Sequence, residues 1–359
     1  MASTESSLGR FTSIRVLVPG TGTRFRCGGL SVALQTARLL SRLRPTQLVT
    51  YRQRQSDHPF LDDLLQQDES SEDVLWLVSW GFDVPLLLRR LKGRPVIYQA
   101  HSSGYGFDLP AGVPVLAVSR NTMGYWGDRA PRNPLFFLPN ALEPQWFERG
   151  ARHLALDSRS IDVLVQRRKS SDYVLRQLVP ALRARGLRVE VQDGWVDDLV
   201  DLFNSAKVYV YDSAEHWRAA GVSEGFGLPP LEAMACGCVV FSSFNHALAD
   251  TLTPGEIGHQ IGCGSLDHDV NRIAAAVADP AAWRPPAALL DPFLEPYSEP
   301  ALMARWQGLL QHLDGLLPAL ATGSMLQSQS LWSLRWNRRR RGLLRVVNRL
   351  PVWPAGRIG

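Results

Sequence analysis

One segment of the chain constrains its fold more than any other. It covers residues 222–243 and reads VSEGFGLPPLEAMACGCVVFSS. Before it, residues 208–211 are apolar and either β-branched or aromatic, as a buried parallel strand requires. The two prolines of the segment fit the first turn of a helix that follows at once, and a glycine ends this helix before a second apolar strand begins at Cys238. The segment therefore predicts a strand, a glycine loop, a helix and another strand of an open parallel sheet.

The loop of this unit combines carboxylates with glycines. In open parallel sheets, ligands bind at the carboxyl ends of the strands, which is where this loop lies. Gly225 and Gly227 let the backbone approach a ligand closely, and the start of the following helix favours negative charge. The carboxylate of Glu232 is placed to accept hydrogen bonds from a vicinal diol such as a ribose. Glu224 and Glu232 thus predict a site for a sugar nucleotide; the alternative is a pair of acids that stabilises the helix start.

The same segment resembles the donor-binding signature of retaining glycosyltransferases of the GT-B fold, family four in particular. There, two glutamates separated by seven residues flank the donor loop, as Glu224 and Glu232 do here. The resemblance implies that Glu224 contacts the donor sugar or its phosphate and that Glu232 contacts the nucleotide ribose. It also implies that four backbone amides bind the donor sugar and diphosphate, those of Gly225, Phe226, Gly227 and Leu228.

The resemblance covers about residues 14–317 and implies an α/β fold of two Rossmann-like domains that face each other across a cleft. A chain of 359 residues with 45% hydrophobic content is long enough for two such cores. We expect an acceptor-side domain at residues 14–142 and a donor domain at residues 143–317. The donor domain includes an amphipathic helix of residues 299–317 that crosses back to the first domain. We expect residues 1–13 to be disordered.

The amino-terminal half alternates strands and helices, as a parallel sheet requires. A strand is predicted at residues 14–18, the glycine loop PGTGTRFRCGGLS follows, and a helix is predicted at residues 30–43. The glycines do not spell G-x-G-x-x-G, which argues against a dinucleotide site. Further strands are predicted at residues 46–51, 74–79, 95–100 and 114–119.

Two places in this half are candidates for the site. The resemblance implies that Gly28 and Gly29 face donor phosphate and acceptor, while a tight turn is the alternative. His101 ends a predicted strand before the loop SSGYGF, and the resemblance implies that it contacts the donor sugar. A charged histidine donates both ring hydrogens and stabilises an oxyanion. The alternative for His101 is a polar residue at the start of a loop.

In the carboxy-terminal half, cations follow the strand predicted at residues 161–165. Arg168 and Lys169 stand at its carboxyl end, where fixed cations stabilise the charge that grows on a departing nucleoside diphosphate. The resembling family places its arginine and lysine five residues apart, so we rank Lys169 first and Arg168 second; a solvated basic loop is the alternative. After the strand predicted at residues 189–191, Trp195 and Val196 resemble the loop beside the nucleotide base.

The acidic pairs of the second half do not predict a metal site. Asp197 and Asp198 open a predicted helix, where acids cap free amides. Asp267 and Asp269 form a D-x-D, but they too precede a predicted helix. We therefore expect no metal and no cofactor, with the nucleotide sugar as co-substrate. The cysteine spacing suggests neither zinc nor a disulfide framework. The cysteines are Cys27, Cys236, Cys238 and Cys263.

The ends of the chain bear on its location. The first 13 residues lack the basic start and apolar core of a secretion signal, and no stretch reaches the roughly eighteen apolar residues of a membrane span. We expect a cytoplasmic protein with a basic amphipathic tail at residues 318–359. Residues 325–353 of this tail are expected to attach it peripherally to the anionic inner face of the membrane. Residues 325–359 contain eight arginines and no acid, mixed with tryptophan and aliphatic residues. A disordered tail is the alternative. A nucleic-acid partner is not expected, because the excess positive charge is confined to this tail.

Together these features predict a retaining, hexosyltransferase-like glycosyltransferase. It moves a sugar from a nucleotide-diphosphate donor to a hydroxyl of a glycan or lipid-linked glycan, in cell-surface polysaccharide synthesis. Two alternatives stay open at this point. One is a sugar-nucleotide epimerase of the GT-B fold, and the other is a non-catalytic protein that binds a sugar nucleotide or a glycan.

Overall fold

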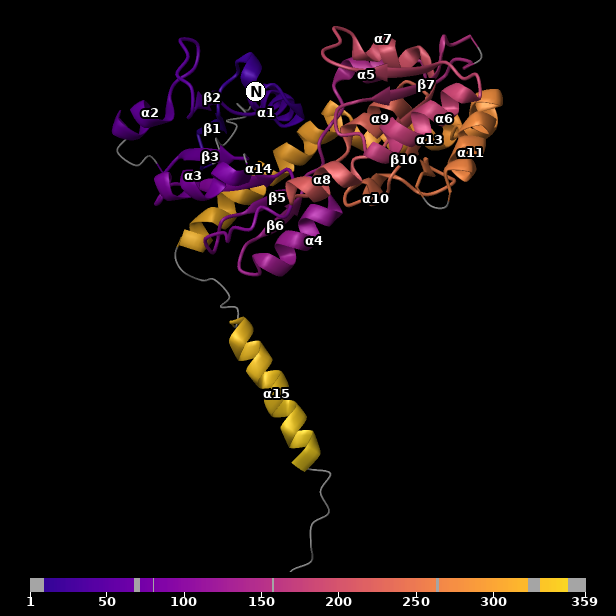
Figure 1. The fold of residues 1–359 in the computed structure, drawn as a ribbon. Coiled ribbons are helices and arrows are strands. Elements are labelled where there is room, and N and C mark those ends of the chain that lie inside the picture. The colour runs from indigo at the N-terminus through magenta and orange to yellow at the C-terminus, as the bar shows by residue number, and fades with distance from the viewer. Residues whose placement is uncertain are drawn as a thin grey trace, which may run out of the picture.

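The computed structural model describes residues 10–67, 72–79, 81–156, 158–262, 265–321 and 330–347. The chain forms two α/β domains, each built on a parallel sheet with helices on its faces (Figure 1). The predicted fold, two Rossmann-like domains joined by a returning helix, is confirmed.

The sheet of the first domain has six parallel strands in the order β2-β1-β3-β4-β5-β6. Its central strands β3 and β4 are buried at every position, because helices cover both faces. The order reverses beside β1, so the loop after β1 lies at the switch point of this sheet. The strands are β1 (Ser13–Val18), β2 (Thr46–Thr50), β3 (Val74–Val78), β4 (Val96–Ala100), β5 (Val115–Ala117) and β6 (Leu135–Phe137).

Helices alternate with these strands. Ser119 caps α4 by accepting a hydrogen bond from the amide of Thr122, and the other long helix of this domain, α1, begins at Gly28 directly after the glycine loop. The helices are η1 (Thr23–Phe25), α1 (Gly28–Leu40), α2 (Leu61–Gln67), η2 (Gly81–Asp83), α3 (Val84–Arg90) and α4 (Arg120–Arg129). The next helix in the chain, α5 (Pro144–Arg149), packs against the second domain, where Trp146 joins the core.

The second sheet has five parallel strands in the order β11-β10-β9-β7-β8. Its order reverses between β7 and β9, so the loops that follow these two strands flank the switch point, where a ligand crevice forms in doubly wound sheets. The strands are β7 (Ile161–Gln166), β8 (Val189–Gln192), β9 (Ala206–Tyr211), β10 (Val239–Ser242) and β11 (His259–Gln260).

The helices of the second domain include one that the sequence pattern did not predict. After β9 we expected a loop and then the helix with the two prolines, but the short helix α8 comes between them. The helices are η3 (Val174–Leu178, π-helical), α6 (Val179–Ala184), α7 (Leu199–Asn204), α8 (Ala214–Ala220), α9 (Leu228–Ala235), α10 (Leu248–Thr251), α11 (Leu266–Ala278), α12 (Pro280–Trp283), α13 (Ala287–Leu294) and η4 (Glu295–Tyr297).

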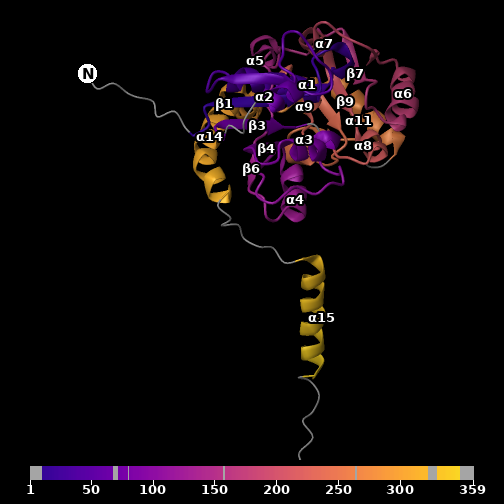
Figure 2. The same cartoon turned by 90° about the vertical axis from the view of Figure 1, so that its left-hand side faces the viewer.

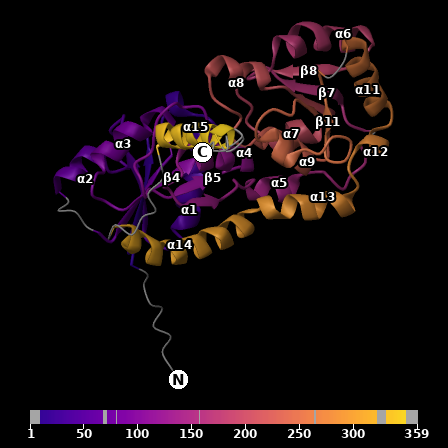
Figure 3. The same ribbon diagram turned by 90° about the horizontal axis from the view of Figure 1, so that it is seen from below.

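Helix α14 (Glu299–Ala321) returns from the second domain to the first, as predicted for residues 299–317 (Figures 2 and 3). Trp306 is fully buried against strands of the first sheet. At the two ends of the contact, Glu299 pairs with Arg38 of α1, and Asp314 pairs with Arg44 at 2.6 Å. A buried apolar stripe and two ion pairs thus fasten the second domain to the first.

Some expectations about the ends of the chain need correction. Residues 10–13 are ordered, since Phe11 is buried and the amide of Thr12 donates to the carbonyl of Asp73. The tail was expected to start at residue 318, but α14 continues to Ala321, and a further helix, α15, spans Leu331–Val347. Residues 1–9, Cys263 and residues 348–359 lie outside the described residues. In the described part of the chain, no helix has the length and apolarity needed to cross a membrane.

Candidate functional site

The predicted site residues lie on the facing edges of the two sheets. Lys169 follows β7 and Glu224 lies between α8 and α9, next to the switch point of the second sheet. From the first domain, Gly28 begins α1 after the loop that follows β1, and His101 directly follows β4. Residues far apart in the sequence thus meet because the carboxyl ends of parallel strands share one edge of each sheet.

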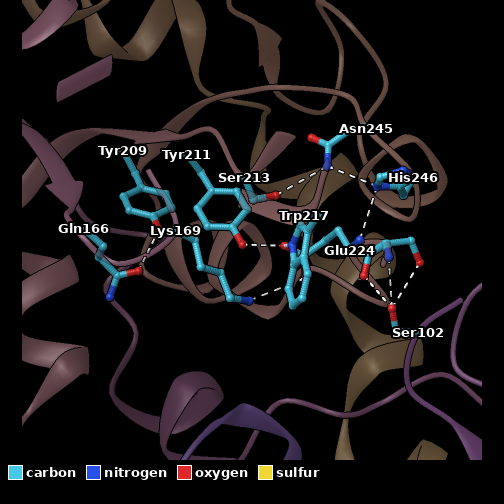
Figure 4. A network of polar contacts seen from close by, with 11 residues as sticks. Ser102, Gln166, Lys169, Tyr209, Tyr211, Ser213, Trp217, Glu224, Asn245 and His246 are labelled. Carbon is cyan, nitrogen blue, oxygen red and sulfur yellow. Dashed lines mark hydrogen bonds and ion pairs between the residues drawn. The ribbon is translucent and has the colours of Figure 1, made fainter. Parts of the chain in front are cut away.

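Glu224 is the centre of a polar cluster (Figure 4). Its side chain is buried, and its Oε2 accepts two hydrogen bonds, one from the hydroxyl of Tyr211 at 2.6 Å and one from the indole Nε1 of Trp217 at 2.7 Å. Burial raises the pKa of Tyr211 well above its usual value, and the Glu224 carboxylate raises it further, so the phenol keeps its proton. Two fixed donors therefore hold one carboxylate oxygen and leave the other, Oε1, for different partners.

Lys169 supplies the cation of this cluster. Its Nζ lies 3.8 Å from Oε1 of Glu224 and 4.5 Å from the ring centroid of Trp217. The backbone of Lys169 is left-handed, with φ at 70°, a conformation that costs a non-glycine residue free energy. Arg168, the second candidate, is exposed and makes no contact with Glu224 among the described residues. Of these two neighbouring cations, Lys169 therefore contacts the Glu224 carboxylate, whereas Arg168 is exposed to solvent.

His246 also joins the cluster. Its Nδ1 accepts a hydrogen bond of 3.2 Å from the backbone amide of Glu224, and its own backbone is left-handed, with φ at 54°. Lys169 and His246 are the two non-glycine residues with positive φ in the described part of the chain, and both adjoin Glu224. Strained backbone conformations cluster at functional sites, so this coincidence adds to the case for Glu224 as the centre of the candidate site.

The glycine loop packs tightly against the first domain. A Cβ built on Gly225 would lie 1.5 Å from the carbonyl oxygen of His101, so this position has room only for glycine. Gly227 has a left-handed backbone, with φ at 86°, and it precedes the first turn of α9. The side chain of Phe226 is buried in the core, and Leu228 begins the helix. Only backbone groups of Phe226 are therefore available to a ligand, as the donor-loop interpretation requires.

Glu232 lies on α9 and is partly buried. Burial raises its pKa to about 8; the charge of Glu143 adds to this increase, and that of Lys169 opposes it. The side chain therefore carries a proton over much of the neutral range when no ligand is bound. A ribose diol donates two hydrogen bonds to a carboxylate, so a ligand of this kind favours the ionised form.

Nucleotide affinity is predicted to depend on the ionisation of Glu232. Because the bound diol prefers the carboxylate, binding releases a proton below the pKa of about 8, and affinity increases with pH by up to about tenfold per unit between pH 6 and 8. Calorimetry in two buffers of different ionisation enthalpy measures this proton release. In Glu232→Gln the release is lost. An equal pH dependence in wild type and variant would contradict the role of Glu232.

His101 is placed where the sequence predicted it, but its charge state differs. Burial lowers the pKa of its imidazole to about 4, and its Nε2 is buried without a partner among the described residues. At neutral pH the ring is uncharged and donates one N–H, so the proposed role of a charged histidine that donates both ring hydrogens is wrong for the free protein.

The two domains touch directly beside this histidine. Ser102 Oγ donates to the carbonyl of Ser223 at 2.6 Å, and Ser103 exchanges backbone and side-chain hydrogen bonds with the same residue. Asp250 of α10 accepts hydrogen bonds from the first amides of α4, including that of Asn121 at 3.1 Å. These hydrogen bonds join the two domains beside α4.

The remaining predicted residues lie across the cleft from one another. A Cβ on Gly28 would meet nothing within 4 Å, so space is open at the start of α1. Arg26 of this loop lies over the ring of Trp195, 5.2 Å from its centroid, and Trp195 is 73% exposed. Gly29 is next to Gly28, and Val196 is next to Trp195 and half-buried. The glycine pair of the first domain therefore faces the proposed base-binding loop of the second.

The acidic residues at helix starts have structural roles. Asp198 accepts a hydrogen bond from the amide of Asp201 and caps α7. Asp269, in the first turn of α11, is buried and accepts hydrogen bonds from Tyr173 and from the amide of Gly262, at 2.6 and 2.7 Å. Neither aspartate faces the Glu224 cluster.

Comparison with known families identifies the second domain. Residues 184–286, which include Glu224, Glu232 and the glycine loop, match the model of the family described as glycosyl transferases group 1. The carboxy-terminal domain is a group 1 glycosyltransferase domain. A search of curated proteins gave no match.

Solved structures agree with this fold. A glycosyltransferase of Rickettsia africae superposes with a TM-score of 0.61 at 11% identity, over 84% of this chain and 98% of the other. HepE of Anabaena, in complex with UDP and glucose, gives 0.59 at 14% identity, over 84% and 100%. Sucrose-phosphate synthase of Thermosynechococcus elongatus gives 0.58 at 16% identity, over 84% and 99%. The two-domain arrangement is thus that of the GT-B fold.

The glycosyltransferase domain contains site residues that the sequence analysis missed. The sequence pattern predicts Tyr211 to lie in a buried strand and assigns it no role in ligand binding. It does not indicate Trp217 or His246 as site residues. Trp217 lies on α8, the helix that the pattern did not predict. One signal was present for Tyr211, because a tyrosine at the end of a strand beside the switch point has its hydroxyl at the ligand edge. The side chains at 217 and 246 meet Glu224 only in the folded chain.

Lys169→Ala is predicted to weaken binding of a nucleoside diphosphate far more than binding of the nucleoside. A charge-assisted hydrogen bond contributes about 1.5–3 kcal/mol, which corresponds to a loss of about ten- to a hundredfold in diphosphate affinity. Calorimetry with the two ligands measures the difference. Lys92, which is exposed beyond α3, provides the matched control Lys92→Ala. If Lys169→Ala lowers the affinity for both ligands equally, Lys169 does not bind the diphosphate.

Proposed function

We propose that this glycosyltransferase transfers a hexose, with retention of anomeric configuration, from a nucleotide-diphosphate donor to a hydroxyl of a glycan or lipid-linked glycan. The observation that carries the proposal is the Glu224 cluster at the switch point of the second sheet. A buried carboxylate with two fixed donors, Tyr211 and Trp217, and one cation, Lys169, adjoins a glycine loop that opens a helix. We propose that the protein works in the cytoplasm and that its product becomes part of a cell-surface polysaccharide.

The geometry supports one orientation of the donor. The diphosphate lies between Lys169 and the backbone amides of the glycine loop and Leu228, because a cation and N–H groups favour an anion. Pro229 and Pro230 contribute no N–H to the first turn of α9. The ribose lies at Glu232, and the base lies beside Trp195 and Val196 at the end of β8. The sugar then lies at Glu224. The structure of HepE contains UDP and glucose, so a UDP-sugar is the first donor to test.

In the reaction we propose, the bond between the anomeric carbon and the donor phosphate oxygen breaks, and a bond to the acceptor oxygen forms. The acceptor proton passes to the departing phosphate, whose charge Lys169 stabilises. An inverting transfer needs a side-chain base near the acceptor. His101 was the nearest candidate, but its pKa of about 4 makes it a weak base at neutral pH. This supports retention.

The reaction is proposed to need no metal ion. Lys169 and the start of α9 already meet the diphosphate charge, and in the described part of the chain no three acidic, histidine or cysteine side chains gather as metal ligands. The Asp267 and Asp269 pair lies in the first turn of α11.

One experiment tests this function. The protein is incubated with donor and a panel of saccharide and lipid-linked acceptors, with and without EDTA, and the product is examined by NMR. The proposal requires a transferred sugar with the donor's anomeric configuration in both conditions. The opposite anomer would show an inverting enzyme, a new sugar nucleotide without transfer would show an epimerase, and loss of transfer in EDTA restored by manganese would show a metal requirement.

The helix α15 supports a membrane-bound acceptor. Its sequence contains six arginines, and the side chains of Trp332, Trp336 and Leu343 are exposed on positions that helical spacing places on one face. The two indoles stack, with centroids 5.9 Å apart. Exposed tryptophan beside arginine suits the headgroup region of an anionic bilayer. We propose that α15 docks the enzyme on such a surface and so concentrates it near a lipid-linked acceptor.

Co-sedimentation with vesicles of anionic phospholipid tests this docking. Each arginine near the surface contributes about 1 kcal/mol, so the full chain is predicted to pellet at low salt and to be released at high salt. A chain ending at Ser324 stays in the supernatant. The variant Trp332→Ser, Trp336→Ser keeps all the charge and loses the apolar contribution, and it is predicted to bind more weakly and with a steeper relative loss in salt. If the full chain also fails to pellet, α15 has no membrane role.

A further inference from the structure

A cavity of about 470 Å³ lies next to the Glu224 cluster and is not explained by the donor. It is formed between the two domains, with α8 on one side and α4 and the loop after β4 on the other. Its volume falls in the range of about 300–1,000 Å³ that is typical of ligand pockets. The residues most relevant to recognition are Ser103, Tyr125, Trp217, Arg218, Gly221 and His246.

The cavity adjoins the proposed reacting centre through two shared residues. Trp217 donates its indole N–H to Glu224 and also lines the cavity. His246 also lines the cavity, and its Nδ1 accepts a hydrogen bond from the backbone amide of Glu224. The predicted donor ligands Lys169, Gly225, Gly227 and Glu232 do not line it. The cavity is therefore a neighbour of the proposed donor site and shares two side chains with the Glu224 cluster.

Its lining has the chemistry of a carbohydrate site. Trp217 and Tyr125 provide aromatic surface from opposite domains, and apolar sugar faces pack on such rings. Because Nδ1 of a neutral His246 acts as acceptor, its ring proton is on Nε2 and is free to donate to a ligand. Arg218 is exposed, and no described residue forms a hydrogen bond or ion pair with its guanidinium. Hydroxyl and carboxylate groups of a saccharide match these donors.

We propose that this cavity is an acceptor subsite that binds one sugar unit of the acceptor glycan, with the ring between Trp217 and Tyr125 and its polar groups at His246 and Arg218. The inference rests on the proposed function, because a sugar beside Glu224 has a role only if a glycosyl group is transferred there. Beyond that function, the inference states that residues of both domains bind the acceptor. An acceptor then binds fully only while the two domains are in contact.

Saturation-transfer NMR tests the subsite without knowledge of the natural acceptor. The probes are methyl α-glucoside, methyl α-mannoside, methyl β-galactoside and glucuronic acid, each with protein and saturating UDP. Ala214→Trp fills the cavity, because Ala214 is part of its lining. Ala219→Trp adds the same side chain to an exposed position of α8 outside the lining and serves as the matched control. Arg218→Ala removes a surface donor with little risk to folding.

We expect at least one sugar to give a signal with wild type and Ala219→Trp, and expect that signal to be lost in Ala214→Trp and Arg218→Ala. UDP affinity, measured by calorimetry, is expected to stay the same in all four proteins. The subsite is refuted if no sugar binds wild type, if the signal survives both cavity variants, or if they weaken UDP as much as the sugar. Sugar binding without any nucleotide binding refutes the proposed function and leaves the carbohydrate site intact.

Discussion

Replacing Glu224 by glutamine is expected to lower the transfer rate by about a hundred- to a thousandfold, without unfolding the protein. The side chain is buried, and Lys169 lies 3.8 Å from its Oε1. Loss of one such charge at a transition state commonly costs about 3–4 kcal/mol. Glutamine keeps the size of the side chain and retains an oxygen for Tyr211 and Trp217, so the loss falls on catalysis. Steady-state rates and thermal unfolding of the variant measure both effects.

The matched control for this substitution is Glu190→Gln on the exposed side of β8. It makes the same chemical change far from the cluster, and its transfer rate is expected to equal that of wild type. If Glu224→Gln transfers sugar at the wild-type rate, Glu224 has no catalytic role, whatever the effect of the substitution on stability.

Gly225→Ala is expected to abolish most transfer and to lower the stability of the protein. A Cβ at this position would lie 1.5 Å from the carbonyl oxygen of His101, which is backbone and cannot rotate away. The glycine loop must therefore move from the loop after β4, and the Ser102 and Ser103 contacts with Ser223 are lost with it. Overpacking of this kind costs about 1–3 kcal/mol even where the structure adjusts.

Gly308→Ala supplies the control for this change. Gly308 is exposed in α14, and a Cβ there meets nothing within 4 Å, so alanine is expected to stabilise the helix by about 0.5–1 kcal/mol. Thermal unfolding and transfer rates are measured for both variants. If Gly225→Ala has the melting temperature and the transfer rate of wild type, the active enzyme does not need the contact between the glycine loop and His101.

The sequence predicted the parts of this molecule that have strong local signals. Long apolar strands, the helix start at the two prolines and the glutamate pair are all such signals, because each depends on residues close in the chain. Strand β11 was not predicted, since two residues give no periodicity. Strand β6 was not predicted because its three residues are only partly buried and stand between Pro134 and Pro139. Helix α8 was missed because its seven residues are too few to show a helical period between the strand and the glycine loop.

The electrostatics of the site could not be read from residue types alone. His101 was expected to act as a cation, but burial lowers its pKa to about 4. Glu232 was expected to be a carboxylate, and burial with Glu143 nearby raises its pKa to about 8. Both shifts depend on how closely the folded chain packs around each side chain, which residue types do not reveal. The roles of these residues in binding stay predictions until a ligand is tested.

Thermal unfolding in the presence of nucleotide sugars tests the central claim most directly. UDP, GDP, ADP and TDP sugars are compared with their free sugars and free nucleosides at equal concentrations. A ligand that binds only the folded state at a hundred times its Kd adds about 2.7 kcal/mol to the free energy of unfolding. We predict that sugars of one nucleotide raise the melting temperature in this way, and that Lys169→Ala removes most of the increase. If no nucleotide sugar or diphosphate changes the melting temperature, the cleft does not bind a glycosyl donor.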